Sequence, residues 1–153
     1  MGIEENKENV RRQIEEFWNR GDFSAVPELI SPEFNYHTPI GDLLGYDGFK
    51  QWVDIWRTAC PDFHMTIDEI VGEDETVAVR LAWTGTFTGR LLEYEPTGNK
   101  VNMNEAWFYH FKDGKDLGPL PYGNPDSAFV QMGIDLKAFR DMETKIKDSR
   151  NVD

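Results

Sequence analysis

The spacing of the apolar residues changes at Pro61, and this change constrains the fold more than any other feature of the sequence. Upstream, Phe49, Trp52, Val53 and Trp56 follow the i, i+3, i+4, i+7 spacing of a helix that buries one face. Downstream, apolar and polar residues alternate, as they do in half-buried strands. Helices are therefore expected first and strands afterwards, an order that is typical of α+β folds.

The boundaries of these elements follow from turn residues. Helices are expected before Gly21, over 23–30 and over 47–59, and a C-terminal helix from Ser127 should be interrupted near Gly133. The long strands are expected at 62–71, 76–84 and 101–111. Gly85 and Gly89 predict a bulge or bend in the sheet. Helices laid across a sheet curved in this way would leave a blind conical pocket.

Charge and apolar content exclude several classes of partner. The formal net charge is −12, which argues against nucleic acid and against an anionic membrane surface. No apolar run approaches the length of a membrane span, and the polar N-terminus lacks a signal core. The single cysteine, Cys60, cannot form an intramolecular disulfide and is expected to be a buried structural thiol. A cytoplasmic protein is expected.

Several short motifs occur in a characteristic order. The stretch "VAVRLAWTGTFTGRLLEYEPTGNKV" (77–101) is followed by "DGK" at 113–115 and by Gln131 and Gly133. In this order and spacing the motifs resemble the SnoaL-like polyketide cyclase (ester cyclase) family of the nuclear transport factor 2-like superfamily. The resemblance covers about residues 8–134.

The resemblance implies an α+β cone, in which N-terminal helices and a C-terminal helix wrap a curved antiparallel sheet. It implies one SnoaL-like domain over 1–153, with its core at about 8–134 and a helical extension at 135–153. It also implies a homodimer or higher homo-oligomer, a small hydrophobic carbonyl ligand and no cofactor. No metal is expected, because three isolated histidines and one cysteine show no ligand spacing.

The catalytic pattern of the family is only partly present. Carried over by position, the pocket histidine of the cyclases falls on His110, and the acid/base aspartate falls on Asn124. A small shift would bring Asp126 to that position instead, although Asp126 is also a good helix N-cap. Asn124 cannot act as a base but could hold an enolate oxygen. Asp116, in the turn, is expected to be solvated.

Glu105 lies on a strand face that is otherwise apolar. It could be paired at a subunit contact, for example with Arg80 or Arg90. It could instead be a desolvated acid with a raised pKa that carries protons. Since His110 lies on the opposite face of the same strand, the face that lines the cone decides between the two.

The expected site thus contains four candidate catalytic residues: His110, Asp126, Glu105 and Asn124. The expected pocket wall contains eight residues: Tyr36, His37, Trp52, Trp56, Arg80, Trp83, Trp107 and Phe108. The predicted function is cofactor-free acid/base catalysis on a hydrophobic carbonyl substrate, by aldol cyclisation, isomerisation or dehydration. Two alternatives are a small-molecule binding module that has lost the base and a ketosteroid-isomerase-like enzyme with a carboxylate deep in the pocket.

Overall fold

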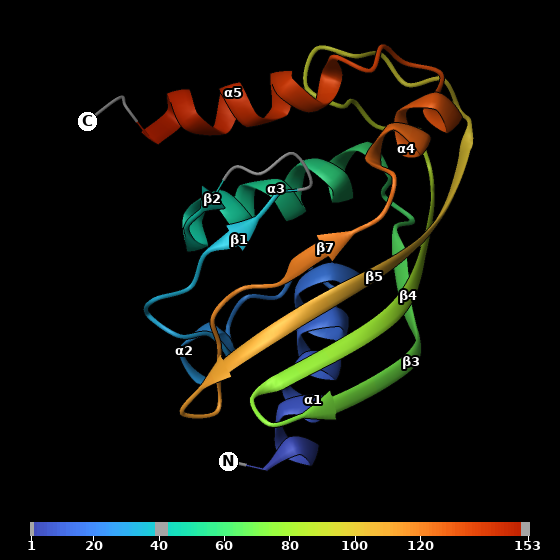
Figure 1. Cartoon of the computed structure of the whole chain (residues 1–153). Helices are drawn as coiled ribbons and strands as arrows, with labels where there is room; N and C mark the ends of the chain where they lie inside the picture. The colour runs from blue at the N-terminus through green and yellow to red at the C-terminus, as the bar shows by residue number, and fades with distance from the viewer. Residues whose placement is uncertain (1, 39–42, 151–153) are drawn as a thin grey trace.

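The computed structural model describes residues 2–38 and 43–150, and a bent antiparallel sheet organises them (Figure 1). Three long strands form its centre in the order β3 (His64–Glu73), β4 (Thr76–Thr86) and β5 (Lys100–Lys112). The short strands β6 (Lys115–Asp116) and β7 (Leu120–Tyr122) both pair with β5. The α+β architecture is confirmed, and the three long strands lie within two residues of their predicted positions.

Helices cover the inner side of this sheet. The chain begins with α1 (Ile3–Gln13), which continues as the π-helical turn η1 (Ile14–Asn19) and contacts β3 and β4. The short helix α2 (Val26–Leu29) precedes a two-stranded ribbon of β1 (Tyr36–His37) and β2 (Leu43–Leu44). Helix α3 (Tyr46–Ala59) follows and matches the predicted stripe.

The C-terminal region forms two helices rather than one. Helix α4 (Pro125–Met132) ends where Gly133 adopts a φ of +76°, a left-handed conformation that glycine accepts at little cost. Helix α5 (Ala138–Arg150) then packs on α3, as Figure 1 shows. The predicted interruption near Gly133 is therefore confirmed. Residues 151–153 of the expected extension lie outside the described residues.

The pairing of β4 with β5 decides which side chains face the helices. Leu81 lies opposite Glu105, and Trp83 lies opposite Met103. Buried and exposed residues alternate along both strands in this register. Glu105 therefore lies on the inner face, whereas His110 lies on the outer face and is exposed.

Of the two glycines that predicted a bulge or bend, Gly89 lies in a bend of the chain just after β4, whereas Gly85 does not mark the register shift of the sheet. The register shift lies in β3, between Ile67 and Glu69. Gly85 keeps its place in the ladder opposite Val101. A Cβ at Gly85 would lie 2.7 Å from the Cβ of Cys60, so this glycine permits close approach of β4 to the end of α3.

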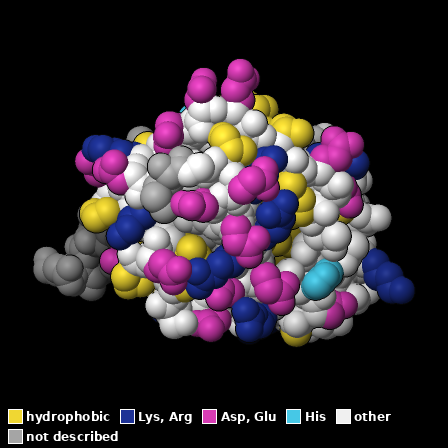
Figure 2. Space-filling model, turned by 90° about the horizontal axis from the view of Figure 1, so that it is seen from below, with side chains coloured by type: hydrophobic (Ala, Val, Ile, Leu, Met, Phe, Trp, Pro, Cys, Tyr) yellow, Lys and Arg dark blue, Asp and Glu magenta, His cyan; other side chains and the backbone are white. Residues whose placement is uncertain are grey.

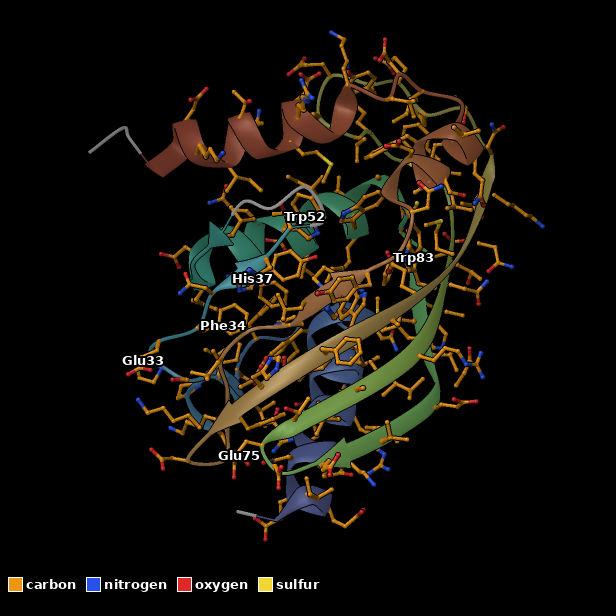
Figure 3. The ribbon with its side chains drawn as sticks, in the orientation of Figure 1. Glu33, Phe34, His37, Trp52, Glu75 and Trp83 are labelled. Atoms are coloured by element: carbon orange, nitrogen blue, oxygen red, sulfur yellow. The ribbon has the colours of Figure 1, made fainter. Side chains whose placement is uncertain are left out.

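The core lies between the sheet and the helices. In Figure 3, Trp52 of α3 and Trp83 of β4 point into this space, whereas Glu33 and Glu75 point outward. The face shown in Figure 2 carries many Asp and Glu side chains mixed with Lys and Arg. Of the helices that the structure describes, none has the length and apolar character needed to cross a membrane.

Candidate functional site

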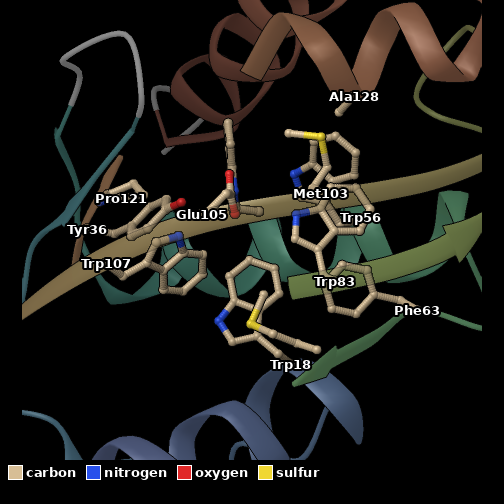
Figure 4. A pocket seen from close by; sticks show the side chains of 12 residues that line it. Trp18, Tyr36, Trp56, Phe63, Trp83, Met103, Glu105, Trp107, Pro121 and Ala128 are labelled. Carbon is tan, nitrogen blue, oxygen red and sulfur yellow. The ribbon is translucent and has the colours of Figure 1, made fainter. Parts of the chain in front are cut away.

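A small, mostly aromatic cavity lies between the sheet, η1, α3 and the β7–α4 segment (Figure 4). Its volume is ≈ 40 Å³. All five tryptophans of the chain contribute to its wall. The twelve lining residues are Trp18, Tyr36, Trp52, Trp56, Phe63, Met65, Trp83, Met103, Glu105, Trp107, Pro121 and Ala128.

The rings of this wall hold one another in place. Trp56 meets Trp83 edge to face with 5.3 Å between centroids, and Trp18 meets Trp107 in the same way at 5.5 Å. Phe63 stacks on Trp83 at 5.1 Å. Such pairs stabilise a packed arrangement beyond the burial of their area. The wall is therefore preorganised, and ligand binding need not order it.

Glu105 is the only carboxylate among the described lining residues. Burial raises the pKa of Glu105 from 4.5 to about 7, and the nearby indole N–H groups of Trp107 and Trp83 oppose this rise. The predicted ion pairs with Arg80 or Arg90 are not formed in the described structure. Arg80 pairs instead with Asp68 and Glu69, and Arg90 pairs with Glu95. Glu105 thus has the environment of a proton carrier.

Trp107 places an unsatisfied hydrogen-bond donor at the cavity. Its side chain is 2% exposed, and its Nε1 finds no acceptor of adequate geometry among the described residues. The indole nitrogen lies on the side of Glu105 (Figure 4) and close enough to lower the pKa of that carboxyl. It nevertheless falls outside the distance or angle limits of a hydrogen bond with that carboxyl. An acceptor in the cavity, a water or a ligand oxygen, can satisfy this donor.

The structure brings six of the predicted residues together. Glu105 and the predicted wall residues Tyr36, Trp52, Trp56, Trp83 and Trp107 all line the cavity. They come from β1, α3, β4 and β5, which supply side chains to one enclosed space. Their catalytic and binding roles stay predictions.

The other predicted residues are placed elsewhere, which corrects their expected positions. His110, Phe108 and Arg80 are exposed on the outer face, because the strand period points them away from the helices. Asn124 and Asp126 are exposed at the start of α4. Asn124, not Asp126, occupies the N-cap position.

His37 does not line the cavity either. It is half-buried in β1, next to Tyr36, which does line it. Neighbouring strand residues point to opposite sides, so the two side chains diverge. Only one of this predicted pair reaches the site.

Six lining residues were not predicted: Trp18, Phe63, Met65, Met103, Pro121 and Ala128. Met65 and Met103 share the inward phase of their strands with Trp83 and Glu105, so the alternation itself carried the signal. Trp18 lies in the π-helical turn, which no pattern in the sequence indicated. Such turns often occur at functional sites.

A second buried carboxyl, Asp116, lies outside the cavity lining. The expectation that it is solvated is wrong, because it is 0% exposed. Gly118 N donates to its Oδ1 at 2.8 Å, and Gln13 Nε2 donates to its Oδ2 at 3.2 Å. Burial raises the pKa of Asp116 to about 7, against these two hydrogen bonds. Asp116 thus ties α1 to the chain before β7.

Neither a thiol nucleophile nor a metal centre is supported among the described residues. Cys60 is buried as predicted, and burial raises the pKa of its thiol to about 11, which disfavours the thiolate. Within residues 2–38 and 43–150, no three His, Cys, Asp or Glu side chains gather as metal ligands would. Acid/base chemistry at Glu105 is what the described cavity can support.

Comparison with known proteins identifies the family. The family model for the SnoaL-like polyketide cyclases matches residues 8–115, which is most of the chain. The chain belongs to this family. No curated protein matches the sequence. This SnoaL-like chain therefore carries the predicted fold, with an aromatic cavity to which β5 contributes Glu105.

Solved structures agree on the fold. A candidate SnoaL-like polyketide cyclase from Jannaschia sp. CCS1 superposes with a TM-score of 0.78 at 18% identity, covering 86% of this chain and 94% of that one. A candidate polyketide cyclase from Acidithiobacillus ferrooxidans superposes with a TM-score of 0.71 at 25% identity, covering 87% of this chain and 98% of that one. A Catenulispora acidiphila protein of ketosteroid-isomerase-like fold, in complex with trimethylamine, gives 0.68 at 17% identity, covering 85% and 95%.

Proposed function

We propose that this SnoaL-like protein is an acid/base enzyme that acts on a small hydrophobic carbonyl compound, with Glu105 as the proton carrier. One observation supports this most directly: a carboxyl whose pKa is raised to about 7 stands in an otherwise apolar, aromatic cavity. A general base works best when its pKa lies near the working pH. Family membership supports the same reaction class.

The chemistry follows from the position of Glu105. Its ionised form takes a proton from the carbon next to a carbonyl, and the electron pair of the broken C–H bond moves to the carbonyl oxygen as an enolate. The protonated Glu105 then returns the proton to carbon, which gives exchange or isomerisation. In a ring closure the enolate carbon instead attacks a second carbonyl, and Glu105 protonates the alkoxide that forms. No step needs another co-reactant.

The size of the cavity bears on the substrate. A volume of ≈ 40 Å³ accommodates only a few water molecules, so a multi-ring compound requires an outward movement of part of the wall. Strand β7 is the weakest part, because it pairs with β5 at three positions only, one of them Pro121. Proline lacks the N–H that a ladder uses. Large substrates would therefore enter past β7.

The test is hydrogen exchange on carbonyl compounds in D₂O, followed by NMR. The protein should accelerate exchange of the protons next to the carbonyl of cyclohexanone. Glu105→Gln should lower this rate by roughly 10²–10⁴-fold, the usual contribution of a general base. Glu75→Gln is the matched control, because Glu75 is an exposed side chain in the β3–β4 turn (Figure 3). Equal rates for the wild type and Glu105→Gln would exclude this role of Glu105.

A second candidate function is binding of a small organic amine without catalysis. Five tryptophans around one carboxylate favour it, because aromatic faces and a negative charge both attract ammonium groups. The fold relative in complex with trimethylamine supports it as an analogy. Tight binding of trimethylammonium, with no exchange on any carbonyl compound, would favour this alternative.

Assembly into a homodimer stays a prediction. The outer face of the sheet offers Phe108, which is 39% exposed and meets Tyr122 edge to face at 5.7 Å. Exposed apolar side chains of this kind suit a subunit contact. Sedimentation of Phe108→Ser and of the wild type tests it.

A further inference from the structure

We propose that the indole N–H of Trp107 is the anchor for a ligand oxygen, so that the cavity selects small compounds with an acceptor oxygen over hydrocarbons and cations of the same size. This inference deepens the proposed function and rests on it for the identity of the cavity as a substrate site. It assigns a binding role to a residue outside the acid/base pattern carried over from the family.

The indole N–H of Trp107 is a buried donor. Trp107 is 2% exposed, and its Nε1 has no acceptor of hydrogen-bond geometry among the described residues. Buried donors are nearly always paired, because an unpaired one loses its bond to water without replacement. An unpaired N–H that lies at a cavity is therefore a site that awaits an acceptor.

The side chain of Glu105 lies beside this donor. Glu105 and Trp107 are two residues apart on β5, so their side chains leave the strand on the same face. Both line the cavity, and the indole nitrogen lies on the side of the carboxyl (Figure 4). A carbonyl oxygen between them would accept the N–H of Trp107 and, below neutral pH, the O–H of protonated Glu105. The proton carrier and the oxygen anchor would then act on one carbonyl group.

Two other ligand classes satisfy this donor less well than an oxygen does. A hydrocarbon fills the same space but leaves the Trp107 donor unpaired, so it loses the gain that an oxygen brings. A cation would meet the positive edge of the indole, because the N–H carries partial positive charge. The orientation of Trp107 thus favours an oxygen at this position over an ammonium group.

The experiment compares three probes: cyclohexanone, methylenecyclohexane and trimethylammonium. Cyclohexanone and methylenecyclohexane have nearly the same shape and differ in the oxygen. A ¹H–¹⁵N spectrum gives one indole signal for each of the five tryptophans. Cyclohexanone should move the Trp107 signal downfield, as a new hydrogen bond does, and should bind roughly tenfold more tightly than methylenecyclohexane.

Two outcomes would overturn the proposal. One is a Trp107 signal that stays unmoved by cyclohexanone up to the solubility of the ketone. The other is binding of methylenecyclohexane or trimethylammonium as tight as that of cyclohexanone. Since these measurements use the wild-type protein, they do not depend on whether a variant folds.

Variants then separate the anchor from the proton carrier. Trp107→Phe should abolish the preference for the ketone, whereas Phe108→Leu, at the next position of the same strand but on its exposed outer face, should preserve it. Glu105→Gln should keep the downfield shift of Trp107 while exchange is lost. If cyclohexanone shifts the Trp107 signal of the wild type but its protons do not exchange, Trp107 is an oxygen anchor and the proposed enzyme activity is refuted.

Discussion

Gly123 lies directly against the side chain of Glu105. A Cβ built on Gly123 would be 2.9 Å from Glu105 Cγ and 3.3 Å from Glu105 Oε1. Gly123 is not among the residues with positive φ, so the backbone conformation does not require glycine there. The requirement comes from the carboxyl, which occupies the space that a side chain at 123 would take.

Replacing Gly123 by Ala should therefore disturb the carboxyl. The added methyl group displaces Glu105 and shields it from water, so its pKa should rise above about 7. A misplaced catalytic group costs up to roughly 10²-fold in rate, so exchange on cyclohexanone should fall by about tenfold or more. A ¹³C titration of the Glu105 carboxyl measures the first effect, and NMR of the ketone measures the second.

The control for this change is Gly2→Ala, because a Cβ on Gly2 meets no atom within 4 Å. It should leave both the titration and the exchange rate unchanged. If Gly123→Ala also left the Glu105 titration and the exchange rate unchanged, the contact between Gly123 and Glu105 would not matter for function.

The stability of the protein should fall as the pH rises from about 4.5 to about 7. Glu105 has its pKa raised from 4.5 to about 7 in the folded state, so the folded protein holds this proton after the unfolded chain has lost it. The unfolded state then binds fewer protons, and the free energy of unfolding decreases with pH across this window, by about 3 kcal/mol for the full shift. Asp116 contributes in the same direction, from 3.8 to about 7.

Urea denaturation at several pH values checks this slope. Glu105→Gln should remove roughly half of this pH dependence, because it removes one of the two carboxyls whose pKa is raised. Glu75→Gln should retain all of it, since Glu75 is exposed. A slope of the opposite sign between pH 5 and 7 would contradict the buried environment of both acids.

Removal of the Asp116 carboxyl should loosen the attachment of α1. Asp116→Ala leaves the donors Gln13 Nε2 and Gly118 N without their acceptor, at a cost of about 1–3 kcal/mol for each. Asp116→Asn keeps one acceptor oxygen and should cost less. Chemical denaturation at pH 6 measures both changes.

The matched control is Asp113→Asn in the neighbouring turn. Asp113 is exposed and has a φ of +52°, which Asn also tolerates. It should leave the free energy of unfolding nearly unchanged. An equally small effect of Asp116→Ala would show that the buried hydrogen bonds contribute little.

His110→Ala should leave exchange on cyclohexanone within about twofold of the wild type, because an exposed side chain on the outer face does not reach the cavity. The rate measurement used for Glu105→Gln serves here as well. A loss comparable to that of Glu105→Gln would mean that the site includes the outer face, in conflict with the register of β4 and β5.

Much of the fold could be predicted from local patterns. The stripe of α3 and the alternation of β4 and β5 placed these elements within two residues, because each periodicity reports one buried face. The same patterns placed four of the seven aromatic lining residues of the cavity, Trp52, Trp56, Trp83 and Trp107. Trp18 lies on the apolar stripe of the first helix, with Val10, Ile14 and Phe17, but a stripe does not tell which of its buried residues reach a cavity.

The sequence named Glu105 and His110 as candidate acid/base residues but could not decide between them. Glu105 and His110 lie on opposite faces of β5, and local spacing gives the alternation without saying which face the helices cover. The register of β4 and β5 and the packing of α1 and α3 decided it. The sequence by itself determined which residues share a face. Only the tertiary structure decided which face is buried, because burial depends on segments that are distant along the chain, and burial raises the pKa of Glu105 and of Asp116.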